Sequence, residues 1–577
     1  MRIFKGIAAS EGLSKGKALL HVRSTMVAEK QHIMAWDVKE ERHKFRTAVE
    51  QAKKALEEHQ GPEISAEPAE ILQTHLMMLS DPEYLAQIDE YISTNLVCAQ
   101  WAVESVTNSM VALLEDSPDE MLKERGVDFK DVSLHLLDAL SNRNRRTVKN
   151  LTEDVILVAD SLMPSELFSM DKKHIIGIAL DGGGRASHVA ILVRAFNIPS
   201  VIALGTASQK VRDGDEILLD GNYGEIVIRP DLTAVQNLNE RYARWMEHEQ
   251  ELRQMIDLPT MTSDGHEVLL KANIQTVSEV DSAKEVGSSG VGLFRSEFLF
   301  MDSEGGSTEE EQFEAYRQVV QAMAPLPVTI RTIDVGGDKV VSGMGIDEKN
   351  PILGWRAVRF CLSRKDIFSV QLRALLRASV YGKLRIMFPM ISGVEELNAV
   401  LHLFEHVKEE CRIENIPFDP DIQVGTMIEV PSAALCADIL AKKVDFFSIG
   451  TNDLIQYTIA VDRGNEKIAH LFQPFHPGVL RSLQMIVEKA HQANIPVSLC
   501  GEMASDPLCS VLLAGLGMDE LSMGSQSLLQ VRKILRSVSF EEAKQLADHV
   551  LEMDSYLTIT TYIREWMHDR FDHFTTI

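Results

Sequence analysis

The sequence predicts a multidomain α/β protein: a small α/β domain with an inserted helical bundle, then a linker helix and a C-terminal (β/α)8 barrel. Three observations lead to this fold class. Short β runs with glycine turns occupy residues 155–230, a nearly continuous helical block precedes them at 36–140, and from residue 261 onward β runs alternate with helical segments. Eight strand–helix units over roughly 300 residues fit a (β/α)8 barrel.

Composition excludes several classes of protein. The chain has 577 residues, enough for several domains, and its formal net charge of −27 argues against a nucleic-acid surface but is compatible with a basic protein partner. The six cysteines are scattered without metal-ligand spacing, which is typical of reduced thiols in the cytoplasm. The N-terminus has no signal-peptide core, and no apolar run approaches the roughly 20 residues of a membrane span. We therefore expect a cytoplasmic protein without membrane insertion.

The N-terminal part predicts a sheet that is interrupted by helices. Residues 1–22 form a short strand-rich start. Helices are expected at 37–58, 68–79, 82–93, 99–115 and 119–140, and later strands at 155–158, 175–180, 201–204, 216–219 and 225–228. The helical block is acidic in places and carries apolar residues at 76–79. It is either a bundle with a solvated acidic face or a docking surface for a basic partner.

The C-terminal part predicts the linker and the barrel. Residues 231–258 are polar and charged, lack glycine and have apolar residues at loose helical spacing, which predicts a long helix that Pro259 ends. The barrel strands are expected at 268–273, 290–295, 328–333, 384–388, 423–429, 445–449, 496–500 and 520–523.

A glycine-rich segment with a histidine lies between two predicted elements. Three glycines at 182–184 follow the apolar run 175–180, and residues 187–195 can be helical. His188 is therefore expected at a strand–glycine–helix junction, where free backbone N–H groups and the helix dipole favour an anion. A neutral imidazole held there could carry a phosphoryl group.

Charged and polar residues follow the predicted barrel strands. They are Arg295, Arg331, Arg356, Glu429, Asn452, Asp453, Arg463 and Cys500. Because the reactive groups of such barrels lie at the C-terminal ends of the strands, we expect these residues at one mouth. Clustered arginines match phosphate or carboxylate oxygens, Glu429 and Asp453 fit the hard ligands of Mg²⁺, and a cysteine can donate a proton to a carbanion.

Each of these residues has another interpretation when it is taken singly. An arginine or Glu429 could belong to a salt bridge, and Asn452-Asp453 could be a turn or a helix cap. Cys500 could be a small buried apolar residue. Their joint occurrence at matched strand ends favours a site.

Several motifs in this order resemble one family, the enzymes I of bacterial phosphoenolpyruvate:sugar phosphotransferase systems. The resemblance covers nearly the whole chain. It is carried by Gly183-Gly184-Arg185 with Ser187-His188, GLFRSEFL at 292–299, FFSIGTND at 446–453 and CGEM at 500–503.

The resemblance implies a phosphoenolpyruvate–protein phosphotransferase. His188 would accept the phosphoryl group, and Cys500 would protonate the enolate to give pyruvate. Phosphoenolpyruvate would be held by Arg295, Arg331, Arg356, Asn452 and Arg463, and Mg²⁺ by Glu429 and Asp453. The phosphocarrier protein HPr would receive the group, as the first step of sugar uptake, and the chain would dimerise through its barrel.

The resemblance also assigns the domains. Residues 1–22 and 144–230 would form a swivelling phosphohistidine domain, and 23–143 the HPr-binding domain. Residues 231–259 would be the linker helix, and 260–577 the phosphoenolpyruvate-binding and dimerisation barrel.

The surroundings of the histidine depart from the family pattern. Leu167, Leu180, Ala186 and Val189 stand where threonine or another small polar residue is usual, which puts the orientation of His188 in doubt rather than its identity. A dikinase or synthase that uses phosphoenolpyruvate is disfavoured, because the sequence has no ATP-binding block with phosphate-gripping glycine loops. A nitrogen-regulatory paralogue of enzyme I and a catalytically degenerate carrier-binding scaffold remain alternatives.

Overall fold

The computed structural model divides the chain into two compact units, Met1–Met246 and Glu247–Ile577. The structure describes residues 1–21, 30–57, 66–115, 120–141, 151, 153–170, 173–184, 187–196, 198–301, 307–336, 350–463, 465 and 467–571. The finer domain bounds expected from the sequence stay predictions.

An eight-stranded sheet forms the α/β part of the first unit. Its strands are β1 (Arg2–Lys5), β2 (Ile7–Ser10), β3 (Leu13–His21), β4 (Val155–Ala159), β5 (Ile175–Leu180), β6 (Ser200–Ile202), β7 (Glu216–Asp220) and β8 (Glu225–Ile228). They lie in the order β1-β8-β7-β3-β4-β5-β6-β2, with β3, β4, β5 and β6 parallel and the other neighbours antiparallel.

The strands predicted from the sequence are confirmed, with one shift. The run expected at 201–204 forms a strand only over Ser200–Ile202. Ala203 has a φ of 58°, in the left-handed region, so the extended backbone cannot continue through it. Two short helices, α6 (Pro164–Ser169) and α7 (His188–Ala195), follow β4 and β5.

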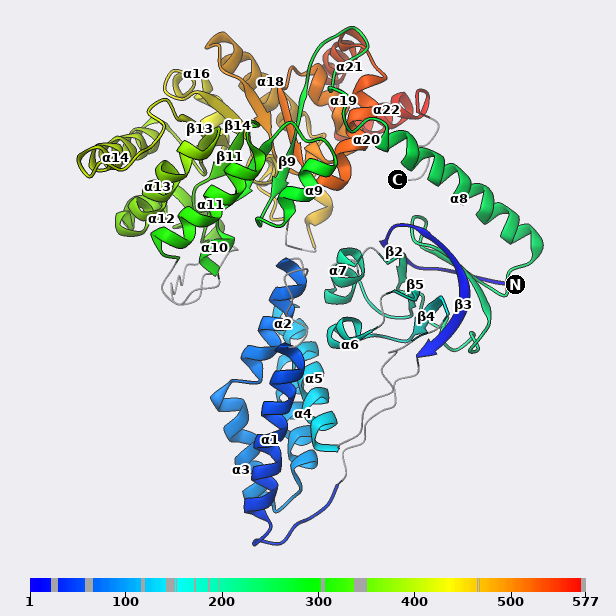
Figure 1. The fold of residues 1–577 in the computed structure, drawn as a ribbon. Helices are drawn as coiled ribbons and strands as arrows, with labels where there is room; N and C mark the ends of the chain where they lie inside the picture. Colours follow the sequence, from blue (N-terminus) through cyan, green and yellow to red (C-terminus); the bar gives the residue numbers. More distant parts are fainter. Residues whose placement is uncertain are drawn as a thin grey trace. The chain divides into compact units, whose positions relative to one another are not determined.

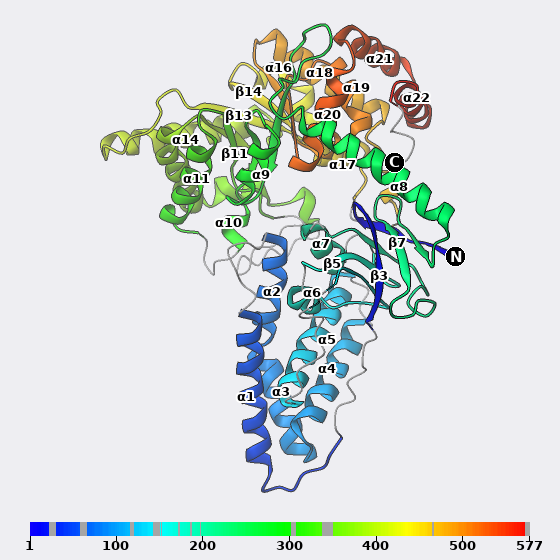
Figure 2. The ribbon, with the colours of Figure 1, turned by 45° about the vertical axis from the view of Figure 1, so that its right-hand side comes forward.

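Helices inserted between β3 and β4 run side by side in both ribbon views (Figures 1 and 2). They are α1 (Val38–Glu57), α2 (Ala66–Met78), α3 (Pro82–Asn95), α4 (Ala99–Glu115) and α5 (Glu120–Ser141). The predicted helices are thus confirmed close to their expected ends. The start of α3 shows why: the Asp81 carboxylate accepts hydrogen bonds from the backbone N–H groups of Glu83 (2.8 Å) and Tyr84 (3.2 Å), and Pro82 suits the first turn.

The linker helix is shorter than its sequence predicts. Helix α8 spans Leu232–Arg253 and not 231–258. Beyond Arg253 the chain makes tight turns, because the Arg532 guanidinium of α20 (Ser525–Arg536) donates to the carbonyl groups of Met255 (2.8 Å) and Ile256 (2.7 Å). These carbonyl groups therefore leave the helical pattern. Pro259 lies several residues past the true end.

The second unit is a closed, all-parallel eight-stranded barrel, as predicted. Its strands are β9 (Leu269–Ile274), β10 (Val291–Arg295), β11 (Val328–Arg331), β12 (Leu384–Phe388), β13 (Gln423–Ile428), β14 (Phe446–Ile449), β15 (Val497–Leu499) and β16 (Glu520–Met523). Neighbours pair in chain order, and β16 closes the ring against β9. Buried aliphatic and aromatic residues such as Ile330, Phe388 and Leu499 lie in one large core.

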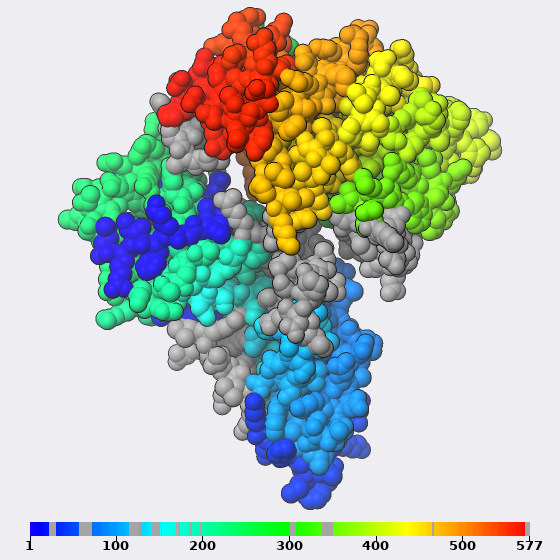
Figure 3. Space-filling view, turned by 180° about the vertical axis from the view of Figure 1, so that it is seen from behind, coloured from blue at the N-terminus to red at the C-terminus, as the bar shows by residue number. Residues whose placement is uncertain are grey.

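Helices surround the barrel strands (Figure 1). They are α9 (Glu279–Glu285), α10 (Phe298–Met301), α11 (Glu309–Met323), α12 (Ala357–Ser363), α13 (Lys365–Ala378), α14 (Val394–Ile413), α15 (Pro431–Leu435), α16 (Ala437–Leu440), α17 (Thr451–Ile459), α18 (Pro477–Gln492), α19 (Pro507–Gly515), α20, α21 (Phe540–Glu552) and α22 (Tyr556–His568). Helix α21 packs against α18 and α19, and α22 packs against α19. These C-terminal helices are red beside orange in Figure 3. Within the described residues, no helix combines the length and apolar character that a membrane crossing requires.

Candidate active site

One cavity lies at the C-terminal ends of the barrel strands. It encloses about 670 Å³, including the part open to solvent. It is lined by Leu293, Arg295, Arg331, Arg356, Met427, Glu429, Gly450, Asn452, Asp453, Arg463, Cys500, Gly501 and Glu502. The structure therefore brings together every site residue that the sequence predicted for the barrel. Their chemical roles stay predictions.

Two buried arginines share a carboxylate at the base of this site. Arg331, at the end of β11, forms ion pairs with Glu297 and with Asp334 (3.2 Å). Arg356 reaches the same Asp334 at 3.1 Å. Burial alone would lower the pKa of each guanidinium, but the neighbouring carboxylates outweigh it and raise both pKa values above the ordinary range. Both side chains are therefore fixed cations in an enclosed space.

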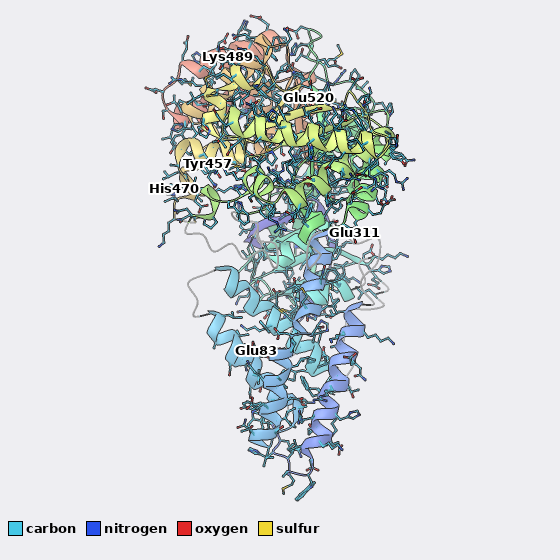
Figure 4. All side chains as sticks on the ribbon, turned by 90° about the vertical axis from the view of Figure 1, so that its left-hand side faces the viewer. Glu83, Glu311, Tyr457, His470, Lys489 and Glu520 are labelled. Carbon is cyan, nitrogen blue, oxygen red and sulfur yellow. The ribbon has the colours of Figure 1, made fainter. Side chains whose placement is uncertain are left out.

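Arg356 has a second set of partners on α17. Its Nη1 atom lies 3.2 Å from Asp453 Oδ1 and donates to the Tyr457 hydroxyl at 3.4 Å. Tyr457, labelled in Figure 4, donates in turn to the carbonyl oxygen of Ile352 at 2.6 Å. This chain of contacts ties the loop before α12 to the helix that follows β14.

Glu429 is the most perturbed acid of the cavity. It follows β13, is 1% exposed, and its Oε1 accepts the backbone N–H of Met390 at 2.6 Å. Burial raises the pKa of this carboxyl well above its usual range, and the negative charges of Asp453 and Asp334 raise it further. Gly450 makes room for it, because a Cβ there would lie 2.7 Å from Glu429 Oε2.

Glu429 and Asp453 fit a hard divalent cation. Both line the cavity with carboxylate oxygens, and a positive ion would relieve the repulsion that raises the pKa of Glu429. Within the described residues, no group of three or more His, Cys, Asp and Glu side chains is arranged to hold a metal. A cation bound here would therefore draw its other ligands from substrate and water, as Mg²⁺ commonly does.

The outer rim of the cavity carries a carboxylate that the sequence analysis did not single out. Asn452 donates from Nδ2 to Glu502 Oε1 (2.8 Å) and accepts the backbone N–H of Glu502 (3.0 Å). Arg463 lies 3.5 Å from the same Oε1. Glu502 therefore engages two groups predicted to hold the anionic substrate. Glu297 and Asp334 were missed as well, although each lies a few residues from a predicted arginine.

Cys500 lies in the wall of the cavity just after β15. It is 4% exposed and belongs to a small apolar cluster with Leu293, Met387, Met427 and Phe446. Burial raises the pKa of its thiol, whereas a hydrogen bond from Ser448 and the charge of Arg331 lower it. The effect of burial is larger, so the pKa lies above its ordinary value. The thiol is therefore protonated near neutral pH and suits an acid better than a nucleophile.

His188 lies in the first unit, where it is the first residue of α7. The Ser187 side chain caps this helix by accepting the N–H of Ala190 at 3.3 Å. The predicted strand–glycine–helix junction is thus confirmed for the backbone. Leu167 and Leu180 are buried in the apolar core of this unit, so they serve packing.

Two neighbours of this junction give less information. Val189 is half-buried. Ala186 and the His188 side chain lie outside the described residues.

Three family models match successive parts of the chain. They describe the N-terminal part of PEP-utilising enzymes (residues 5–125), their mobile domain (151–224) and their PEP-binding domain (249–540). The last of these spans the barrel strands and every cavity residue named above.

Full-length relatives agree with these matches. Proteins named phosphoenolpyruvate-protein phosphotransferase are 41% identical in Haemophilus influenzae, 39% in Priestia megaterium and 38% in Bacillus subtilis. Each comparison covers 98% of this chain and at least 99% of the relative. The chain therefore belongs to the phosphoenolpyruvate-protein phosphotransferase family.

Proposed function

We propose that this chain transfers the phosphoryl group of phosphoenolpyruvate to His188 and then to the phosphocarrier protein HPr, releasing pyruvate. The observation that carries the proposal is the single cavity that combines four arginines, two adjacent carboxylates and a protonated thiol. An anionic substrate with a leaving enolate needs this combination of charge neutralisation and a proton source.

The arginines bind and orient the substrate. Guanidinium forks match phosphate and carboxylate oxygens, and phosphoenolpyruvate carries both groups. Arg331 and Arg356 are held in place by Asp334, so little side-chain freedom is lost when the substrate arrives. Arg295, Arg463 and Asn452 complete the cradle.

Mg²⁺ is the cation that we assign to Glu429 and Asp453. When bound, it would neutralise phosphate charge and stabilise the enolate oxygen. The protein's own part is to hold these two carboxyl groups at one cavity, where the arriving cation displaces the proton of Glu429.

His188 is the proposed acceptor, because a neutral imidazole is a competent nucleophile near neutral pH and its phosphorylated form splits one transfer into two. The start of α7 favours the incoming anion through its free N–H groups. His188 and the cavity belong to different units, so turnover requires the histidine to reach the cavity and then the carrier.

We assign carrier binding to the helical insertion, residues 23–143, and dimerisation to the barrel, residues 260–577. The insertion is acidic in places, and Trp36 and Met77 expose large apolar side chains (77% and 66%). Such a surface suits a basic protein partner. The phosphohistidine domain would comprise residues 1–22 and 144–230, joined to the barrel by the linker at 231–259.

Intact-mass analysis after incubation with phosphoenolpyruvate and Mg²⁺ tests the function. The chain should gain one acid-labile phosphoryl group, and added HPr should remove it while becoming phosphorylated itself. A chain that binds HPr but gains no mass would be a carrier-binding scaffold. A labelled chain that passes its group to a paralogous carrier, but not to HPr, would be the nitrogen-regulatory type.

The raised pKa of Glu429 predicts that cation binding depends on pH. Below this pKa the carboxyl is protonated and cannot act as a ligand, so a cation must displace a proton. We expect Mn²⁺, used as a probe, to bind more tightly as pH rises from about 6 to about 8, with proton release. Calorimetry in two buffers of different ionisation enthalpy measures both effects. Glu429→Gln should abolish the proton release, and an affinity that is constant over this range would contradict the prediction.

A further inference from the structure

Ser448 lies in the barrel interior within hydrogen-bond distance of the Cys500 thiol. Its hydroxyl, fully buried on β14, donates to Cys500 Sγ at 3.3 Å. The thiol in turn lies 3.7 Å from the carbonyl oxygen of Ile449, as donor to that oxygen. The sulfur is therefore fixed between a donor on one side and an acceptor on the other.

The backbone of Cys500 is braced from two other strands. The Asn273 amide of β9 donates to the carbonyl oxygens of Cys500 (3.1 Å) and Ser522 (3.2 Å). The Ser522 hydroxyl of β16 donates back to Asn273 Oδ1 at 2.6 Å. These bonds hold the main chain of Cys500. The Ser448 hydroxyl, in contrast, contacts the Cys500 sulfur itself. The two sets of contacts are separable by mutation.

We propose that Ser448 is the positioning residue of the proton-donating thiol, and that its hydroxyl stabilises the thiolate which remains after proton transfer to the enolate. This inference rests on the proposed function and on Cys500 as its acid. The sulfur has no other hydroxyl donor in the described contacts of the cavity wall. Hydrogen bonds to an ionised group are stronger than those to its neutral form, so the Ser448 bond strengthens as the proton leaves.

The step balances as a simple proton transfer. The S–H bond of Cys500 breaks and a C–H bond forms at the methylene carbon of the enolate. The enolate π electron pair becomes the new C–H bond, and the oxygen reforms the carbonyl group of pyruvate. The S–H electron pair stays on sulfur as a thiolate that accepts the Ser448 O–H, and water returns the proton afterwards.

The test compares two buried serines of adjacent strands. Ser448→Ala removes the donor to Cys500. Ser498→Ala, on β15, removes another buried hydroxyl, whose hydrogen bond goes to the Phe447 carbonyl oxygen (3.3 Å) and not to the thiol. Ser448 and Ser498 are direct neighbours in the sheet, so the two variants perturb packing alike. Cys500→Ala defines the full loss of the acid.

Ser448→Ala should lower the rate of pyruvate formation by about 10- to 100-fold, the usual effect of removing a hydrogen bond to a charged group. The affinity for phosphoenolpyruvate should stay unchanged. The solvent deuterium isotope effect on turnover should increase, because proton transfer becomes slower than the other steps. Ser498→Ala should keep both the rate and the isotope effect of the unaltered chain.

The inference is overturned if Ser448→Ala turns over within about twofold of the unaltered chain, or if its isotope effect does not change. Equal slowing in Ser498→Ala would also overturn it, because packing would then explain the loss. Failure of the proposed function looks different: the unaltered chain itself would form no pyruvate.

Discussion

Replacing His188 by alanine should abolish covalent phosphorylation of the chain and all phosphoryl transfer to HPr, while phosphoenolpyruvate still binds. The loss is complete because no other group can take the place of a covalent acceptor in the reaction sequence. Binding survives because the residues that should hold the substrate line the barrel cavity, which belongs to the other unit. Intact mass measures the first effect and titration calorimetry the second.

The matched control is His43→Ala, which removes an exposed histidine from α1 and should leave labelling intact. Two results would contradict the prediction. Labelling of the His188→Ala chain would show that another residue accepts the phosphoryl group. Loss of substrate binding together with labelling would show that the two tasks are not divided between the units.

Replacing Asp334 by alanine should destabilise the barrel by about 3–5 kcal/mol, the usual cost of removing one member of a buried ion pair. Asp334 is fully buried and faces both Arg331 and Arg356, so its loss leaves two enclosed cations without a shared carboxylate. Affinity for phosphoenolpyruvate should fall too, because the two guanidinium groups are no longer fixed in position. Scanning calorimetry of the full chain and a binding titration measure these effects.

Two comparisons separate charge from shape. Asp334→Asn keeps the size and one acceptor oxygen, so it should recover part of the stability but little of the electrostatic restraint. Asp366→Ala removes an exposed carboxylate that pairs with Arg364 at 2.8 Å, and it should leave the barrel transition nearly unchanged. Equal calorimetric transitions for the Asp334 and Asp366 variants would contradict the account of a buried network.

The barrel and its mouth could be predicted from the sequence because both depend on local patterns. Alternation of apolar runs with helical segments locates the strands, and the residue after each strand must lie at the same end of the barrel. Arg331, Glu429 and Cys500 stand at the ends of such runs, so the positions of the predicted strands were enough to place them at one site.

Contacts between distant residues could not be predicted in the same way. Asp334 acquires its importance from its ion pair with Arg356, which lies 22 residues further along the chain. Glu502 faces Asn452 across neighbouring strand ends, and nothing in the spacing of the two residues shows that they meet. The early end of α8 depends on Arg532, which lies 277 residues after Met255 in the sequence. Such effects are tertiary and leave no periodic signal.

The unequal exposure of the cavity arginines makes the response to ionic strength asymmetric. The side chains of Arg331 and Arg356 are 7% and 3% exposed, whereas that of Arg463 is 40% exposed and faces the still more exposed Glu502 (78%). Dissolved salt screens charges in water over about 10 Å at 0.1 M but acts weakly on pairs enclosed by protein. Salt should therefore slow the arrival of the substrate at the rim, where Arg463 attracts it. It should hardly change how long the seated substrate remains, because the inner arginines are shielded from mobile ions.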